Sequence, residues 1–143
     1  MTTIAFDGKV LAADRRKTLG HGIIRSGTKL YDCGEFVFGS CGDAAHGVVV
    51  AEWLKAGRPA EHPKLDDDCV FGIAIRKSDR AIFQVEDEQF VLVQLEDAQH
   101  AVGSGRDFAL SAMALGMTAP QAIEFAARFD AGTGNGVDVY EFS

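Results

Sequence analysis

The feature of the sequence that constrains the fold most strongly is the order of its β-prone and helical segments. β-prone runs occupy residues 2–39, a helical period follows over 43–56, and β-prone runs return over 69–102. Two further helical segments and a last β-prone run, residues 137–142, complete the sequence. Groups of strands separated by groups of helices predict an α+β sandwich in which helices cover antiparallel sheets.

The strand prediction begins with a hairpin. Residues 2–6 and 9–14 are β-prone and flank Asp7-Gly8, a dipeptide typical of tight hairpin turns. The first strand therefore starts beside the beginning of the chain. Further strands are expected over 21–25, 29–31, 35–39, 69–76, 81–86, 90–95, 98–102 and 137–142. The four strands within residues 69–102 are expected to form an antiparallel meander.

Three helices are expected. Residues 43–56 and 106–115 supply the first two, and each is bounded by turn-forming residues. Thr118 opens the third helix, because Gln121 three residues later completes a capping-box pattern. Residues 58–68 are polar and contain two prolines, so they are expected to form an exposed loop.

Composition limits the class of protein. A chain of 143 residues fits a single domain, 1–143, and its 47% hydrophobic and 24% charged residues are typical of a globular protein. No apolar run approaches the roughly 18 residues of a membrane span. The first residues lack the basic and apolar regions of a secretory signal. Neither a membrane nor a secretory route is therefore expected.

Charge and cysteine usage exclude further partners. The net charge is −7, and Arg15-Arg16-Lys17 is the only basic triplet, so nucleic acid is a poor candidate partner. The three cysteines form no CxxC pair, and the four histidines are dispersed, so no metal site is expected. Reduced thiols indicate a cytoplasmic protein. No cofactor is expected.

The start of the chain carries the first candidate chemistry. Met1 followed by Thr2 favours removal of the initiator methionine, which leaves Thr2 with a free α-amine beside its own hydroxyl. A threonine hydroxyl needs an adjacent base to become a nucleophile, and an α-amine with a pKa of about 7.7–8.0 is such a base. Many cytosolic proteins begin with Met-Thr, so this feature alone does not define an enzyme.

Two charged residues could tune that amine. A lysine such as Lys29 would lower the pKa of a nearby amine by like-charge repulsion, and an aspartate such as Asp14 would hold the lysine in place. A surface salt bridge is the commoner explanation for such a pair.

The segment Gly39-Ser40-Cys41-Gly42-Asp43 lies between a predicted strand and a predicted helix. A glycine N–H at such a junction can stabilise an oxyanion, helped by the positive potential of the helix N-terminus. A plain glycine turn capped by Asp43 is the alternative. Cys41 is a second candidate nucleophile, because helix N-termini lower the pKa of thiols.

Six motifs in a fixed order, spread over nearly the whole chain, resemble the proteasome β-subunit family. This family of N-terminal-nucleophile hydrolases includes the bacterial peptidase HslV. The matching segments are Thr2-Thr3-Ile4, Ala13-Asp14-Arg15-Arg16, Lys29-Leu30, Gly39 with Gly42-Asp43, Gly103-Ser104-Gly105, and Asp130 with Gly134 and Asp138.

The resemblance implies a role for each matched residue. Thr2 would be the nucleophile, Lys29 the catalytic lysine and Asp14 the acidic partner of that lysine. The N–H of Gly39 would form the oxyanion hole. Three further residues would surround the threonine amine, namely Ser104, Asp130 and Thr133.

A pocket for the substrate side chain before the cleaved bond is also implied. Its walls would come from Lys17, Val37, Cys41 and Ala45. Three of these residues are apolar and one is cationic, so a preference for apolar or mixed side chains is expected.

The resemblance also implies a four-layer α-β-β-α sandwich of two antiparallel sheets. Residues 58–68 stand where the family has a second long helix, so one helical layer is expected to be truncated. Family members assemble into rings around a closed chamber. The expected function is therefore a threonine endopeptidase that cleaves peptides or unfolded polypeptide within a homo-oligomeric ring, with an ATPase unfoldase as candidate partner.

Two other functions stay open at this point. A structural ring subunit without activity would keep Met1 and would need neither Thr2, Asp14 nor Lys29. A hydrolase that uses Cys41 would be sensitive to iodoacetamide and independent of Thr2. The presence of all three matched polar residues favours the threonine peptidase.

Overall fold

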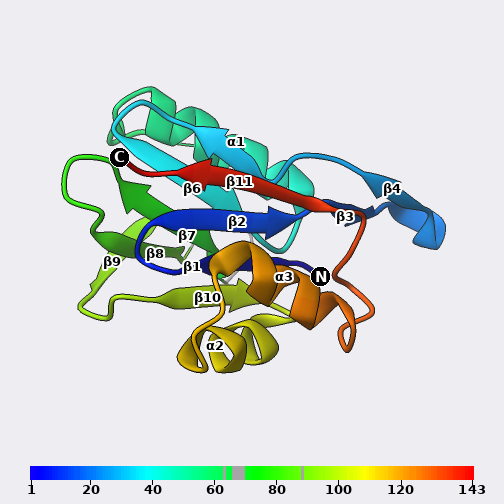
Figure 1. Ribbon diagram of the computed structural model, residues 1–143. Helices are drawn as coiled ribbons and strands as arrows, with labels where there is room; N and C mark the ends of the chain where they lie inside the picture. Colours follow the sequence, from blue (N-terminus) through cyan, green and yellow to red (C-terminus); the bar gives the residue numbers. More distant parts are fainter. Residues whose placement is uncertain (63, 66–69, 88) are drawn as a thin grey trace.

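The computed structural model describes residues 1–62, 64–65, 70–87 and 89–143 (Figure 1). No helix formed by these residues is long and apolar enough to cross a membrane. The elements in chain order are β1 (Thr3–Phe6), β2 (Val10–Asp14), β3 (Arg16–Thr18), the 3₁₀ turn η1 (Gly20–Gly22), β4 (Ile24–Ser26), β5 (Leu30–Asp32), β6 (Phe36–Ser40), α1 (Ala44–Lys55), β7 (Val70–Arg76), β8 (Ile82–Glu86), β9 (Val91–Leu95), β10 (His100–Gly103), α2 (Arg106–Ala114), α3 (Ala119–Ala127) and β11 (Val137–Glu141).

The hairpin predicted at the start of the chain is confirmed. β1 and β2 pair antiparallel, with Ile4 opposite Ala13. The Asp7 carboxylate closes the turn by accepting two backbone N–H groups from the start of the second strand, at 2.9 and 2.8 Å. One step further along this register, Thr3 faces Asp14, so the position of the turn brings Asp14 beside the start of the chain.

Two antiparallel sheets form the body of the protein. One has the strand order β10-β1-β2-β11 and the other β5-β6-β7-β8-β9, while β3 and β4 form a separate hairpin that projects from one end (Figure 1). The predicted meander holds for β7, β8 and β9, but it was wrong for β10, which pairs with β1 in the other sheet. β10 gains burial on both faces there, since Ala101 packs towards the helices and Val102 towards the opposite sheet.

The alternation of side chains along the strands sorts the core into three clusters. In β1, Ile4 faces the other sheet and Ala5 faces α2 and α3. In β6, Val37 faces the other sheet, whereas Phe36 and Phe38 face α1. From one side to the other, the order is α1, the five-stranded sheet, the four-stranded sheet, and α2 with α3 (Figure 1). The α+β fold with antiparallel sheets is thus confirmed.

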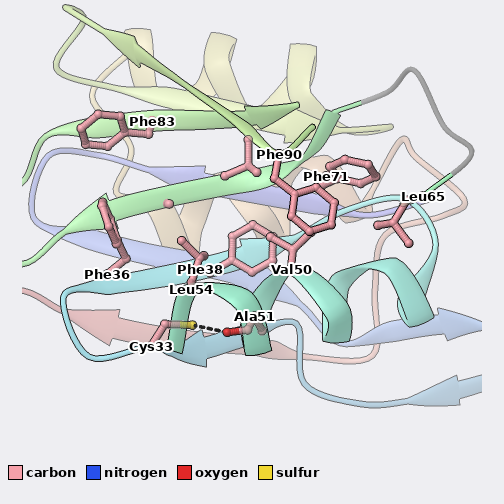
Figure 2. Close-up of a cluster of buried hydrophobic side chains, with 12 residues drawn as sticks. Cys33, Phe36, Phe38, Val50, Ala51, Leu54, Leu65, Phe71, Phe83 and Phe90 are labelled. Carbon is pink, nitrogen blue, oxygen red and sulfur yellow. Dashed lines mark hydrogen bonds between the residues drawn. The ribbon is translucent and has the colours of Figure 1, made fainter. Parts of the chain in front are cut away.

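An aromatic cluster fixes α1 on its sheet (Figure 2). Val50 of the helix and Phe38 and Phe71 of the sheet are all buried in it. The thiol of Cys33 donates a hydrogen bond to the backbone carbonyl of Ala51 at 3.6 Å (Figure 2). Burial of each large apolar side chain stabilises the fold by roughly 1.5–3 kcal/mol, so this layer holds α1 against β6 and β7.

The predicted starts of two helices are also confirmed. Asp43 caps α1 by accepting the N–H groups of Ala45 and His46 at 2.8 and 3.3 Å. Thr118 caps α3, and its capping box with Gln121 is complete. Such caps contribute about 1 kcal/mol each and define where the helices begin.

Two expectations about the irregular segments change. The segment expected as a strand over 21–25 begins with the 3₁₀ turn η1, and only its later part forms β4. β4 pairs with β3, which was not predicted because its polar residues lack the apolar alternation of a strand. In the loop expected over 58–68, residues 58–62, 64 and 65 form neither helix nor strand, but Leu65 is buried in the cluster beneath α1. The remainder of that loop, and Cys69, lie outside the described residues.

Gly39 allows the two sheets to approach each other. A Cβ at this position would come within 2.6 Å of Ile4 Cγ2 and 3.2 Å of Leu30 Cδ2. We expect Gly39→Ala to lower the free energy of unfolding by about 1–3 kcal/mol, because packed neighbours must move. Urea unfolding measures this, with Gly20→Ala as the control, since a Cβ at Gly20 meets nothing within 4 Å. Equal stability of the two variants would contradict the prediction.

Candidate active site

Thr2 lies directly before β1 and is only 3% exposed. Its hydroxyl accepts a hydrogen bond from Lys29 Nζ at 2.7 Å and donates one to the carbonyl of Met1 at 2.6 Å. Its backbone N–H donates to Ser104 Oγ at 3.1 Å. A lysine ammonium therefore faces the hydroxyl of Thr2, and a serine hydroxyl faces its nitrogen.

Asp14 ends β2 and has no exposed surface. One carboxylate oxygen accepts the Thr3 N–H at 3.1 Å and Lys29 Nζ at 2.7 Å. The other oxygen accepts the N–H groups of Arg16 at 3.2 Å and Gly134 at 3.0 Å. Four donors surround this group, which suits an ionised carboxylate because that form only accepts hydrogen bonds. Asp14 thereby fixes both the lysine and the loop that precedes β11.

Lys29 reaches the site from the other sheet. Its carbonyl accepts the Ser40 N–H at 2.8 Å at the start of the β5–β6 pairing, and its side chain is 5% exposed. Burial lowers the pKa of Lys29, while the hydrogen bond and negative charge of Asp14 partly oppose this shift. The packing of the two sheets thus holds one ammonium at 2.7 Å from both the Asp14 carboxylate and the Thr2 hydroxyl.

Ser104, which contacts the nitrogen of Thr2, belongs to a hydrogen-bonded cluster with Asp130 and Thr133. The Ser104 hydroxyl donates to Asp130 Oδ2 at 2.6 Å, and the Thr133 hydroxyl donates to the same oxygen at 2.5 Å. The hydroxyls of Thr3 and Thr133 lie 2.6 Å apart. Burial raises the pKa of Asp130, but the hydrogen bonds from the Ser104 and Thr133 hydroxyls help to outweigh burial and hold this pKa below its usual range. An anionic carboxylate at this point favours positive charge on a nearby amine.

Arg16 holds the loop that carries Asp130 and Thr133. Its guanidinium donates to the carbonyl of Ala131 at 2.6 Å and to the side chain of Asn135 at 3.0 Å. Residue 134 is glycine in this loop, and a Cβ there would come within 2.5 Å of the guanidinium. The structure therefore brings together the six predicted polar residues Thr2, Asp14, Lys29, Ser104, Asp130 and Thr133.

A cavity of about 450 Å³ opens onto Thr2 and Lys29. Its walls come from the start of the chain, the β3–η1 segment, the end of β6 and the start of α1, and they comprise residues 1, 2, 16–20, 29, 40 and 42–44. Among the described residues, no group of three or more His, Cys, Asp and Glu side chains is placed to hold a metal ion.

Of the four residues predicted to form the substrate pocket, Lys17 borders this cavity and the others do not. Val37 lies between the sheets and borders a different cavity, between β5 and β11. The Cys41 thiol is also buried in the inter-sheet core and donates to the Val70 carbonyl at 3.4 Å. Ser40, the last residue of β6, borders the cavity, whereas the following Cys41 does not. The lining continues from Gly42 to Ala44 and ends one residue before Ala45.

Gly39, the expected source of the oxyanion-binding N–H, does not border the cavity. It is an interior residue of β6, opposite Leu30 of β5 and Ile73 of β7. In such a strand the backbone groups bond to the strands on either side. The absence of a side chain at Gly39 leaves room for Ile4 of the other sheet.

Gly42 borders the cavity in its place. The N–H of the preceding Cys41 donates to the Phe71 carbonyl in β7 at 2.8 Å. β6 ends at Ser40, and Gly42 lies beyond it with φ +79°, in the left-handed region that favours glycine, so its N–H takes no part in the strand pairing. It makes no hydrogen bond to another described residue. The signal for this glycine in the sequence was its position directly before the helix cap Asp43.

Both Cys33 and Cys41 are buried. Burial raises the pKa of Cys33 to about 11. Only a thiolate reacts readily with iodoacetamide, so at about pH 7.5 we expect Cys33 to stay unmodified in the folded protein and to be alkylated in urea. Mass spectrometry of tryptic peptides measures both states, and equal labelling rates would contradict the prediction.

Comparison with known proteins shows which solved structures share this fold. No protein-family model matches the sequence, and no curated protein matches it. Solved structures do match over 99% of this chain and 98% of theirs: BPH of Thiobacillus denitrificans (22% identity, TM-score 0.69), BPH in complex with epoxomicin (20%, 0.68), and eukaryotic HslV from Trypanosoma brucei (21%, 0.71). The chain therefore has the fold of these proteins, which confirms the resemblance at the level of fold.

Proposed function

We propose that this chain is a threonine peptidase subunit of the proteasome β-subunit and HslV type, folded as a single domain over residues 1–143. The observation that carries the proposal is one ammonium, Lys29 Nζ, at 2.7 Å from both Thr2 Oγ1 and Asp14 Oδ1. A buried ion pair of this kind contributes little net stability compared with apolar packing, so a chemical role explains it better than a structural one. This argument favours an active subunit over an inactive ring component.

The nucleophile becomes complete when Met1 is removed and the peptide nitrogen of Thr2 becomes an α-amine. The Thr2 hydroxyl then transfers its proton to that amine as its oxygen forms a bond to the carbonyl carbon of the substrate. The Lys29 ammonium stabilises negative charge on the attacking oxygen. Ser104, backed by Asp130, accepts the Thr2 peptide N–H at 3.1 Å while Met1 is attached, and the same hydroxyl supports the protonated amine once Met1 is removed.

The oxyanion formed in this step lies against the Gly42 N–H, which borders the cavity and makes no hydrogen bond to another described residue. The protonated amine next gives its proton to the leaving nitrogen, the carbon–nitrogen bond breaks, and an ester to Thr2 remains. Water then attacks this ester while the same amine takes its proton. Release of the acid product returns a proton to the Thr2 oxygen.

Assembly forms the second part of the proposal. The resemblance to HslV-type proteins supports a homo-oligomeric ring with the threonines inside a chamber, unfolded polypeptide as substrate and an ATPase unfoldase as partner. α1 stands alone on its sheet among the described residues, which supports a truncated helical layer on that side.

The proposal is tested by assaying the purified protein against casein and fluorogenic peptides while its N-terminus is determined by intact-mass spectrometry. We expect cleavage by protein that begins at Thr2 and none by protein that retains Met1. Protein that begins at Thr2, forms particles in electron micrographs and cleaves nothing would instead support the inactive ring subunit.

A further inference from the structure

The cavity above Thr2 carries an excess of positive charge. Arg16, Lys17 and Lys29 border it, and Asp43 is the one carboxylate among the described residues that line it. The Asp43 carboxylate is engaged by the first N–H groups of α1, at 2.8 and 3.3 Å. Lys29 is neutralised by its ion pair with Asp14. The remaining positive charge belongs to residues 16 and 17.

Lys17 differs from Arg16 because its charge has no partner. The guanidinium of Arg16 donates to Ala131 and Asn135, whereas Lys17 forms no ion pair or side-chain hydrogen bond with any residue that the structure describes. The Lys17 side chain is nonetheless half-buried.

The stem of Lys17 lies against Gly27. A Cβ at Gly27 would come within 2.8 Å of Lys17 Cε and 3.3 Å of its Nζ. A glycine across the hairpin thus lets this side chain lie flat at the edge of the cavity. The charge also reaches the reacting group, because Lys17 adds to the lowering of the pKa of Lys29, whose largest cause is burial.

The rest of the cavity leaves room for a side chain beside this ammonium. Several lining residues are small, namely Gly20, Ser40, Gly42 and Ala44. An apolar side chain in this space would displace water from the Lys17 ammonium without replacing its hydrogen bonds, which is unfavourable. A carboxylate would replace the lost water with a charge-assisted hydrogen bond.

We propose that Lys17 selects substrates with an acidic side chain immediately before the cleaved bond. This inference rests on the proposed function and names its substrate class. It replaces the preference for apolar or mixed side chains expected from the sequence, since Val37, Cys41 and Ala45 do not border the cavity.

The test compares peptides that are identical except for Glu or Gln before the cleaved bond, two side chains of nearly equal shape. We expect the wild-type protein to favour Glu in kcat/KM by about tenfold, as for a partly exposed ion pair at the upper end of its range. Lys17→Met should reduce the Glu-to-Gln ratio to about one, and Lys17→Glu should favour a Lys substrate. Lys9→Met removes a distant, exposed lysine and should keep the wild-type ratio.

Two results would overturn the inference. One is an equal Glu-to-Gln ratio in the wild-type protein and Lys17→Met. The other is a uniform loss for every peptide in Lys17→Met with a shifted pH profile, which would mean that Lys17 acts through Lys29. Absence of all cleavage would contradict the proposed function itself. In that event, the affinity of labelled Glu and Gln peptides for Thr2→Ala protein still tests the selection, with about tenfold tighter binding of Glu expected and equal binding contradicting it.

Discussion

Thr2→Ala is expected to abolish peptide cleavage, with a loss in kcat of roughly 10⁴-fold or more. The variant keeps the backbone nitrogen that Ser104 contacts but lacks the oxygen that accepts the Lys29 hydrogen bond. No bond to the substrate carbonyl can then form at this position. Initial rates on fluorogenic peptides and casein measure the loss.

Two variants control for this result. Thr2→Ser keeps a hydroxyl and an amine on one residue and should retain measurable activity. Thr28→Ala removes an exposed threonine hydroxyl near Lys29, and it should leave the rate unchanged. Among the described residues, this hydroxyl bonds only to the Leu30 carbonyl. Full activity in Thr2→Ala would eliminate Thr2 as the nucleophile.

Lys29→Met should lower kcat by about 10³-fold, as expected for loss of a buried charge that stabilises the reacting oxygen. It also leaves the Asp14 carboxylate buried without its cation, which costs about 3–5 kcal/mol of stability. Kinetics must therefore be measured beside urea unfolding of the same protein.

The double variant Asp14→Asn/Lys29→Met separates the two effects. It removes both buried charges, so we expect it to regain part of the stability that Lys29→Met loses while remaining inactive. A double variant that regains activity together with stability would show that Lys29 serves the fold and not the reaction.

The parts of the site that the sequence could predict are those fixed by local rules. The Asp7-Gly8 turn determines the hairpin register, and this register alone places Asp14 beside the start of the chain. Asp43 and Thr118 were identifiable as caps because a cap bonds to the next few residues. Lys29 was one candidate from the sequence, and only the resemblance assigned it the catalytic role, since its approach to Thr2 depends on how the two sheets pack.

The expectations that differ from the structure concern features that tertiary contacts determine. The resemblance assigned Val37 and Cys41 to the substrate pocket, whereas both lie in the core between the sheets, and the sequence does not state which face of β6 meets the second sheet. Gly39 and Gly42 lie three residues apart in one segment, and only the pairing of β6 with both neighbours shows that Gly39 is an interior strand residue. The transfer of β10 to the other sheet likewise depends on burial that no local pattern reveals.

The central claim is that the hydroxyl and the α-amine of Thr2 act together beside Lys29. Labelling with a peptide epoxyketone, which reacts with both groups of an N-terminal threonine, followed by tandem mass spectrometry of the digest, tests it most directly. The account predicts a single adduct on a peptide that begins at Thr2, with no adduct in Thr2→Ala. Active protein whose N-terminal peptide remains unmodified, or still begins with Met1, would contradict it.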